Sequence, residues 1–248
     1  MNTSTSDSAW FETWFDTEYY HILYSNRDDQ EAEFFIDNLL NYIQPNKDDA
    51  HLLDLACGKG RHSIYMNKLG YQVTGADLSE NSITTARIHE NEKLSFVVQD
   101  MREPLNQKFS HILNMFTSFG YFDSIQDNLK VMQAIDAMST SETVLVFDYL
   151  NAFKVRKNLV HSEQKFIKDI TFNITRKTDA NHVYKYIQVI DGDKVFNFME
   201  RVQLLQLKDF RVLLESINFE IMDIFGNFQL DSFVKELSDR LILIARKK

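Results

Sequence analysis

The sequence is poor in residues that interrupt or cross-link a chain: its 248 residues include two prolines, seven glycines and one cysteine. Few chain breakers favour long helices and strands with short connections, so a disordered or many-module chain is not expected. The single cysteine, Cys57, excludes a disulfide within the chain and gives no support to an oxidising compartment.

Long apolar runs and basic blocks are missing as well. No apolar stretch approaches the ~20 residues that a membrane-spanning helix needs, and residues 1–9 lack the basic-then-apolar layout of a signal peptide. The formal net charge is −9, and no basic block precedes residues 246–248. Proteins that grip duplex phosphates usually carry a basic stripe. We therefore expect a cytoplasmic protein that binds neither a membrane nor bulk nucleic acid.

What is present is an alternation of short apolar strands and amphipathic helices from residue 52 to 150, which is typical of parallel βαβ units. The strands expected there are 52–55, 71–76, 94–99, 111–115 and 143–148. A helical stretch that begins at residue 210 precedes two more strands, near 219–225 and 241–245. These elements predict an α/β fold with a doubly wound, mostly parallel sheet of seven strands.

Two segments depart from this alternation. Residues 10–43 are predicted to form two amphipathic helices dense in aromatic side chains. Three runs of alternating apolar and polar residues lie within 165–207, and the turn that contains Gly192 favours a hairpin, so a small antiparallel insert is predicted. The expected units are an N-terminal helical segment or lid, a ligand-binding core, the β insert, and a last helix with two strands that complete the core sheet. Their expected bounds are 1–50, 51–150, 151–207 and 208–248.

Polar groups follow each of the first three expected strands. The turn at 54–60 (DLACGKG) contains two glycines, which let the backbone approach a ligand, and the helix after it offers free N–H groups. Asp77 ends the second strand, where a carboxylate accepts hydrogen bonds from both hydroxyls of a ribose. Asp100 and Met101 follow the third strand, where they suit an adenine. Ligands of open α/β sheets bind at the carboxyl ends of the strands. These three groups of residues therefore predict a single pocket for a nucleoside.

Residues 52–60 (LLDLACGKG), 73–79 (VTGADLS) and 100–102 (DMR) resemble the motifs of class I S-adenosylmethionine-dependent methyltransferases, which have a Rossmann-like fold. Ala56 stands where many members have their first glycine, and Ala is a common small residue there. Dinucleotide sites usually have a third glycine where this chain has Ser63, so the loop favours S-adenosylmethionine over NAD. The resemblance covers the five-stranded core and extends to the last two strands.

The resemblance implies a role for each matched position. The glycine turn lies beside the methionine moiety of the cofactor, Asp77 holds the ribose, and Asp100 and Met101 frame the adenine. Residues after the fourth strand lie near the sulfonium and the acceptor. The implied cofactor-binding residues within the core are Asp54, Ala56, Cys57, Gly58, Gly60, Asp77, Leu78, Ser79, Asp100, Met101, Asn114 and Phe116. The cofactor product is S-adenosylhomocysteine. No metal site is expected, because the seven histidines show no ligand spacing.

The N-terminal aromatic residues have two interpretations. They form a helix face packed on the core, or they cover the cofactor, whose sulfonium is attracted to aromatic faces by ~0.5–2 kcal/mol. Similar methyltransferases place a tyrosine over the cofactor, which makes Tyr20 and Tyr24 the candidates, with Arg27 reaching the cofactor carboxylate. No general base is evident, and the candidates for a catalytic role are Tyr20, Asn114, Tyr149 and Arg201. Glu200 is either a solvated partner of Arg201 or part of a substrate clamp.

The expected activity is transfer of a methyl group to nitrogen or oxygen of a small-molecule acceptor by in-line displacement. The predicted insert is similar to that of small-molecule N- and O-methyltransferases, where it forms a wall or a contact in a homodimer. Three alternatives stay open: a non-catalytic S-adenosylmethionine-binding regulatory module, an aminopropyl transferase on the same scaffold, and an NAD-dependent oxidoreductase.

Overall fold

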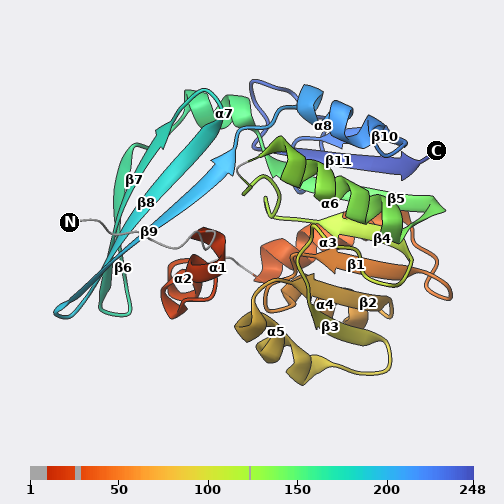
Figure 1. The fold of residues 1–248 in the computed structure, drawn as a ribbon, viewed down its shortest axis with the longest axis horizontal. Coiled ribbons are helices and arrows are strands. Elements are labelled where there is room, and N and C mark those ends of the chain that lie inside the picture. The colour runs from red at the N-terminus through yellow and green to blue at the C-terminus, as the bar shows by residue number, and fades with distance from the viewer. Residues whose placement is uncertain (1–9, 26–28, 123) are drawn as a thin grey trace.

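The computed structural model describes residues 10–25, 29–122 and 124–248, which form two sheets and the helices that pack beside them (Figure 1). The larger sheet has seven strands in the order β10-β11-β5-β4-β1-β2-β3. Strands β1 to β5 run parallel, whereas β11 is antiparallel to both of its neighbours. These strands are β1 (His51–Leu55), β2 (Gln72–Asp77), β3 (Leu94–Val98), β4 (Phe109–Asn114), β5 (Ser139–Leu150), β10 (Phe219–Phe225) and β11 (Arg240–Lys247). The predicted doubly wound, mostly parallel sheet is confirmed.

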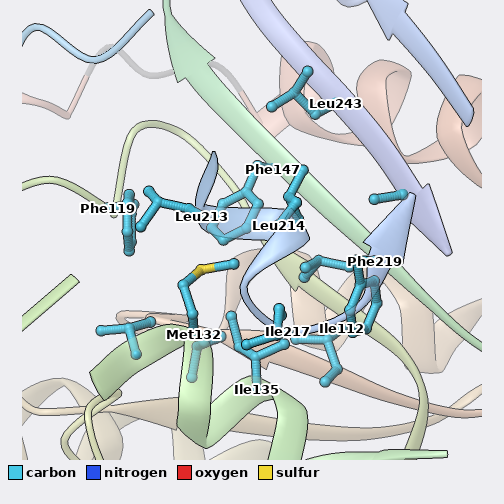
Figure 2. Packing of buried hydrophobic residues seen from close by; sticks show 14 of the residues in the cluster. Ile112, Phe119, Met132, Ile135, Phe147, Leu213, Leu214, Ile217, Phe219 and Leu243 are labelled. Atoms are coloured by element: carbon cyan, nitrogen blue, oxygen red, sulfur yellow. The ribbon is translucent and has the colours of Figure 1, made fainter. Parts of the chain in front are cut away.

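Helices cover both faces of this sheet, because each presents an apolar stripe to it. On one face, α6 (Ile125–Met138) and α8 (Leu207–Glu215) form a buried cluster with the strands. Figure 2 shows Met132 of α6, Leu214 of α8 and Phe147 of β5 in this cluster. The opposite face buries a second cluster under three further helices. These are α3 (Asp29–Ile43), α4 (Arg61–Lys68) and α5 (Glu80–Ala86), the last continued by the short η1 (Arg87–His89).

The smaller sheet is an antiparallel insert of four strands in the order β6-β7-β8-β9. Its strands are β6 (Ser162–Ile167), β7 (Ile170–Thr178), β8 (His182–Asp191) and β9 (Lys194–Gln203), and α7 (Ala152–Lys157) connects it to β5. The sequence predicted three strands, and that prediction missed β6. The missed turn is Lys168-Asp169, whose φ angles of 51° and 64° are left-handed although neither residue is a glycine or asparagine.

The N-terminal aromatic segment (residues 10–25) lies between the insert and the core (Figure 1). It contains two short helices, α1 (Trp10–Trp14) and α2 (Glu18–Leu23). Together with α3, the described residues of 10–43 therefore form three helices rather than the predicted two. Trp14 and Tyr19 are buried against apolar residues of the insert sheet. None of the helices in the described ranges is long and apolar enough to cross a membrane.

Candidate functional site

A cavity of about 360 Å³ opens at the carboxyl ends of β1, β2, β3 and β4, between the core and the N-terminal aromatic segment. Its volume lies within the range of ligand pockets, roughly 300–1,000 Å³. The core residues that line it include Asp54, Ala56, Cys57, Gly58, Lys59, Arg61, His62, Asp77, Leu78, Ser79, Asp100, Met101 and Phe116. We call it the first cavity.

The turn after β1 lies at the cavity, and its small residues Ala56 and Gly58 leave the main chain exposed to it. Ala56 and Gly58 have left-handed φ angles of 65° and 56°, and the N–H of Ala56 donates to the carbonyl of Ala76 on β2 at 2.7 Å. A Cβ placed on Gly58 would have no atom within 4 Å. Because Gly58 lines the cavity, that open space belongs to it, and glycine leaves the space to a ligand.

Gly60 differs from Gly58 in its surroundings. It does not line the first cavity. A Cβ there would lie 2.5 Å from the ring of Phe96, and its φ angle is 79°. Gly60 precedes α4 as its N-cap, so glycine is needed there for backbone conformation and close packing.

Asp77 ends β2 with its carboxylate held by two main-chain donors. The N–H of Gly58 donates to Oδ2 at 2.8 Å, and the N–H of Ser79 donates to Oδ1 at 2.9 Å. Burial raises the pKa of Asp77 despite these hydrogen bonds. Each carboxylate oxygen accepts a further hydrogen bond readily, so the geometry suits the two vicinal hydroxyls of a ribose.

Asp54 is a second carboxyl group at this edge, with 1% of its surface exposed. Ser63 of α4 donates to its Oδ2 at 2.6 Å. Burial raises the pKa of Asp54 to about 6, and the Ser63 hydrogen bond offsets part of this effect. The buried Asp54 and the half-buried Asp77, on neighbouring strands, thus give the cavity a polar floor, where donors of a ligand can be bound.

Asp100 closes the cavity after β3. The guanidinium of Arg102 donates to both of its carboxylate oxygens, from Nε at 3.0 Å to each. Burial opposes ionisation of Asp100, but the hydrogen bonds and charge of Arg102 outweigh it and lower the pKa of the carboxyl group. Met101 beside it supplies an apolar surface, and a carboxylate next to an apolar side chain suits a purine base with its exocyclic amine.

Aromatic rings form the remaining wall. From the N-terminal aromatic segment come Phe11, Phe15, Tyr20, His21 and Tyr24, and from the loops after β4 come Phe116, Tyr121 and Phe122. The ring of Tyr20 lies 4.9 Å from that of Phe15, which in turn lies 5.3 Å from that of Tyr121. Asp16 connects this segment to the turn after β2, because Ser79 Oγ donates to its Oδ1 at 2.6 Å.

The turn after β4 is built around Phe116. Its φ angle is 55° and that of Thr117 is 62°, which is a strained conformation for these residues. The ring of Phe116 stacks on His62 with centroids 4.8 Å apart. Oδ2 of Asp148 on β5 accepts from the Phe116 N–H at 2.8 Å, and Arg240 on β11 donates to its Oδ1 at 2.7 Å. An ion pair between the buried Asp148 and the half-buried Arg240 therefore fixes the strained turn.

Most of the residues predicted to bind a cofactor come together in this cavity. Those that line it are Tyr20, Tyr24, Asp54, Ala56, Cys57, Gly58, Asp77, Leu78, Ser79, Asp100, Met101 and Phe116. Burial raises the pKa of the Cys57 thiol, which is consistent with a packing role and not with a nucleophile. Arg27 lies outside the residues that the structure describes.

Three candidates for a catalytic role do not line the cavity: Asn114, Tyr149 and Arg201. Asn114 Nδ2 donates to the carbonyl of Leu55 at 3.0 Å, so its side chain joins β4 to β1. The hydroxyl of Tyr149 donates to the carbonyl of Gln203 at 2.6 Å. Of the four candidates only Tyr20 faces the cavity. The sequence predicted no role in binding for Lys59 or Arg61, although Lys59 lies within the glycine-turn motif, and both line the cavity.

Comparison with known proteins agrees with this geometry. The profile of a family described as a methyltransferase domain matches residues 46–203, more than half of the chain. Two curated relatives are similar in sequence. The glycine/sarcosine/dimethylglycine N-methyltransferase of Actinopolyspora halophila is 24% identical over 237 residues, 91% of this chain and 40% of its own. The dTDP-3-amino-3,4,6-trideoxy-alpha-D-glucopyranose N,N-dimethyltransferase of Streptomyces venezuelae is 34% identical over 83 residues, 31% of this chain and 32% of its own.

The chain spans less than half the length of the first curated relatives that it matches. Among solved structures, an S-adenosylmethionine-dependent methyltransferase from Clostridium acetobutylicum ATCC 824 superposes with a TM-score of 0.78. The two are 19% identical, and the superposition covers 92% of this chain and 96% of that one. At this identity the likeness demonstrates the shared fold.

Proposed function

Because this chain belongs to the S-adenosylmethionine-dependent methyltransferase family, we propose that it methylates the nitrogen of a small amine. The single observation that carries the proposal is the first cavity, in which a glycine turn, Asp77 and Asp100 converge under a wall of aromatic rings. Both curated relatives described above have N-methyltransferase names, which favours nitrogen over oxygen as the methyl acceptor.

The residues present fit the cofactor of this family. The open space beside Gly58 suits the methionine moiety, because a Cβ there would meet no protein atom. Asp77 is held by main-chain donors in a position to accept from ribose hydroxyls. Asp100 and Met101 line the cavity and would flank the adenine. When bound, S-adenosylmethionine supplies an electrophilic methyl group on a sulfonium centre.

The chain's own contribution is positioning and exclusion of water. Aromatic rings from the N-terminal aromatic segment and from the turn after β4 enclose the cavity, and their faces attract a cation by ~0.5–2 kcal/mol. Holding two reactants in line contributes several kcal/mol toward the barrier without a dedicated base. An amine acceptor must nevertheless arrive at the reacting geometry as the neutral amine, since a protonated nitrogen has no lone pair.

The test is methyl transfer from labelled S-adenosylmethionine to a panel of matched amines and alcohols. The panel includes glycine, sarcosine and the aminosugar nucleotide named above, each beside its hydroxyl analogue. We expect turnover of at least one amine and none of its hydroxyl analogue, and loss of turnover in Asp77→Asn. Transfer only to hydroxyl groups, or binding of S-adenosylhomocysteine without transfer to any acceptor, would contradict the proposal. Transfer of an aminopropyl group would identify a different reaction on the same scaffold.

A further inference from the structure

A second cavity, of about 350 Å³, lies between the insert sheet, α7 and the end of β5. Its walls are apolar, with Leu150, Val155, Leu159, Val160, Val183 and Val202. Four charged side chains of the insert also line it: Glu163, Arg176, Lys185 and Glu200. Glu163 pairs with Arg176, and Glu200 with Lys185. Only the latter pair is bonded to a residue of the first cavity.

That residue is Tyr24, which lines the first cavity. Its hydroxyl donates to the Glu200 carboxylate, with Oη 2.7 Å from Oε1 and 2.9 Å from Oε2. Lys185 Nζ donates to the same hydroxyl oxygen and lies 4.4 Å from the centroid of the tyrosine ring. Trp14 Nε1 donates to Glu200 Oε1 at 2.8 Å. The hydroxyl of Tyr24 therefore connects the two cavities through a carboxylate.

The register of the insert creates this arrangement. Lys185 of β8 and Glu200 of β9 are directly paired, so both side chains emerge on the face that packs against the N-terminal aromatic segment. Their side chains are only 13% and 14% exposed. One sequence interpretation had Glu200 as a solvated partner of Arg201. The structure instead shows a largely buried side chain. A carboxylate at this depth is costly unless it is hydrogen-bonded, and here its donors include the hydroxyl of Tyr24, a residue that lines the first cavity.

A second tyrosine–carboxylate bond joins the same two elements and serves as an internal comparison. The hydroxyl of Tyr19 on α2 donates to Asp191 Oδ2 of β8 at 2.9 Å. Tyr19 does not line the first cavity, and Asp191 does not line the second. Anchoring of the N-terminal aromatic segment to the insert is therefore available from Asp191 without any contact with the cavities.

We propose that Glu200 takes up, through the hydroxyl of Tyr24, the proton that an ammonium acceptor loses before methyl transfer. This inference rests on the proposed amine acceptor. One N–H bond of the ammonium breaks as its proton bonds to Oη of Tyr24, and the original hydroxyl proton passes to the Glu200 carboxylate. The acceptor is left as a neutral amine with a lone pair, and Glu200 as a neutral acid. No electron donor or oxidant is needed.

The surroundings of the pair fit this step. Lys185 donates to the Tyr24 oxygen, so the hydroxyl hydrogen is directed at Glu200. Glu200 also lines the second cavity, which gives the proton a route to solvent that avoids the first cavity. Glu200 acts through Tyr24 and never touches the acceptor, so its effect must be separated from simple anchoring.

The experiment compares Glu200→Gln with Asp191→Asn, each of which keeps the size of the side chain and an oxygen that accepts from the tyrosine. With glycine or the aminosugar nucleotide as acceptor, we expect Glu200→Gln to lower kcat about 100-fold at neutral pH, the usual scale of proton-transfer catalysis. The loss should shrink as rising pH deprotonates the free amine. Asp191→Asn should keep the wild-type pH profile, and both variants should match the wild type in affinity for S-adenosylhomocysteine. Glu200→Gln should also unfold at a lower temperature, because it leaves the largely buried Lys185 without its carboxylate.

A binding measurement tests the same step without turnover. Infrared difference spectra, recorded as the amine is added to the complex with S-adenosylhomocysteine, report a carboxylate that gains a proton. We expect the band of a newly protonated carboxyl group in the wild type and in Asp191→Asn but not in Glu200→Gln. If the wild type methylates amines but both variants share its pH profile and its infrared change, the inference is overturned and the proposed function stands. If the wild type neither methylates nor binds any amine, the proposed function is overturned and the inference with it.

Discussion

The N–H of Phe116 donates to Oδ2 of Asp148 across 2.8 Å and so fastens one wall of the first cavity to the middle of the core sheet. Phe116 has a left-handed φ angle, a conformation that costs of order 1–3 kcal/mol and persists only where neighbours enforce it. The Asp148 side chain is fully buried and is paired with Arg240. The Asp148 carboxylate therefore neutralises the charge of Arg240 and also stabilises the strained turn at Phe116.

Asp148→Ala should destabilise the fold and weaken cofactor binding together. It removes the acceptor of the Phe116 N–H and leaves Arg240 without its carboxylate, and breaking a buried pair in this way costs about 3–5 kcal/mol. Urea unfolding measures the first effect, and calorimetry with S-adenosylhomocysteine measures the second. The matched control is Asp239→Ala, because Asp239 forms an ion pair with Lys154 at the surface, with its own side chain 75% exposed. Exposed pairs contribute about 0–1 kcal/mol, so equal losses in the two variants would refute the role assigned to Asp148.

Most of the predicted cofactor-binding residues line one cavity because their sequence signals are local. A strand that ends in Asp77, or in a turn with Gly58, places those groups at the carboxyl edge wherever the strand lies in the sheet. Asn114 and Tyr149 lie on neighbouring parallel strands, but their side chains donate to main-chain carbonyls and do not line the cavity. Whether a side chain at the end of a strand faces the cavity depends on tertiary contacts, and a local sequence pattern does not predict these contacts.

The Glu200 cluster was beyond sequence reasoning for a related reason. Its partners Trp14 and Tyr24 are more than 170 positions away along the chain, at separations of 186 and 176. Strand β6 was missed because its turn, Lys168-Asp169, lacks the glycine or asparagine that usually marks left-handed turn positions. The partners of Glu200 and the pairing of β6 are both determined by packing and strand register. A single sequence has no residue spacing that predicts either of them.

The affinity for S-adenosylhomocysteine should fall as pH falls, because Asp77 becomes protonated. Ribose hydroxyls donate to a carboxylate, so binding favours the ionised form, whereas burial raises the pKa of Asp77 in the free chain. Affinity is therefore complete above this raised pKa and is lost as pH decreases through it, at a pH where an exposed aspartate is still ionised. Asp77→Asn should bind about 10–100-fold more weakly at high pH, as expected for loss of charge-assisted hydrogen bonds.

Calorimetric titrations from about pH 5 to pH 8 would check this prediction, since that window covers the region above an ordinary aspartate pKa. The wild-type affinity should decline toward the acid end, while that of Asp77→Asn stays level. A parallel decline in both proteins would assign the pH dependence to another group.

Ionisation of Asp54 should lower the free energy of unfolding of the ligand-free protein as pH rises. Its pKa of about 6 exceeds the ordinary value of 3.8, so the folded chain holds this proton more tightly than the unfolded chain does. The resulting stability is complete below pH 3.8 and is lost as pH rises through about 6. A difference of about two pKa units corresponds to roughly 3 kcal/mol.

Asp54→Asn removes this ionisation and keeps an oxygen that accepts from Ser63. We expect the variant to gain stability relative to the wild type as pH rises from about 4 to 7, by up to roughly 3 kcal/mol, and to level off above that. Urea unfolding of both proteins at a series of pH values measures the difference. A difference that does not change with pH would show that Asp54 is ionised alike in the folded and unfolded chains.

Gly58 and Gly192 form a natural pair for testing whether the glycine turn meets the cofactor. Their φ angles are 56° and 57°, and a Cβ on either would have no atom within 4 Å. Replacement by alanine should therefore strain both positions alike, at a cost of about 1–2 kcal/mol. Only Gly58 lines the first cavity, because Gly192 lies in the turn between β8 and β9.

Gly58→Ala should thus lower the affinity for S-adenosylhomocysteine at least about tenfold, the effect of ~1.4 kcal/mol, because the new methyl group occupies space left for the ligand. Gly192→Ala should bind as the wild type does while unfolding at the same reduced urea concentration as Gly58→Ala. Equal stability loss with unequal affinity separates occupation of the cavity from backbone strain. If both variants bound with unchanged affinity, the open space beside Gly58 would not be where the methionine moiety lies, and the assignment of the turn would have to be withdrawn.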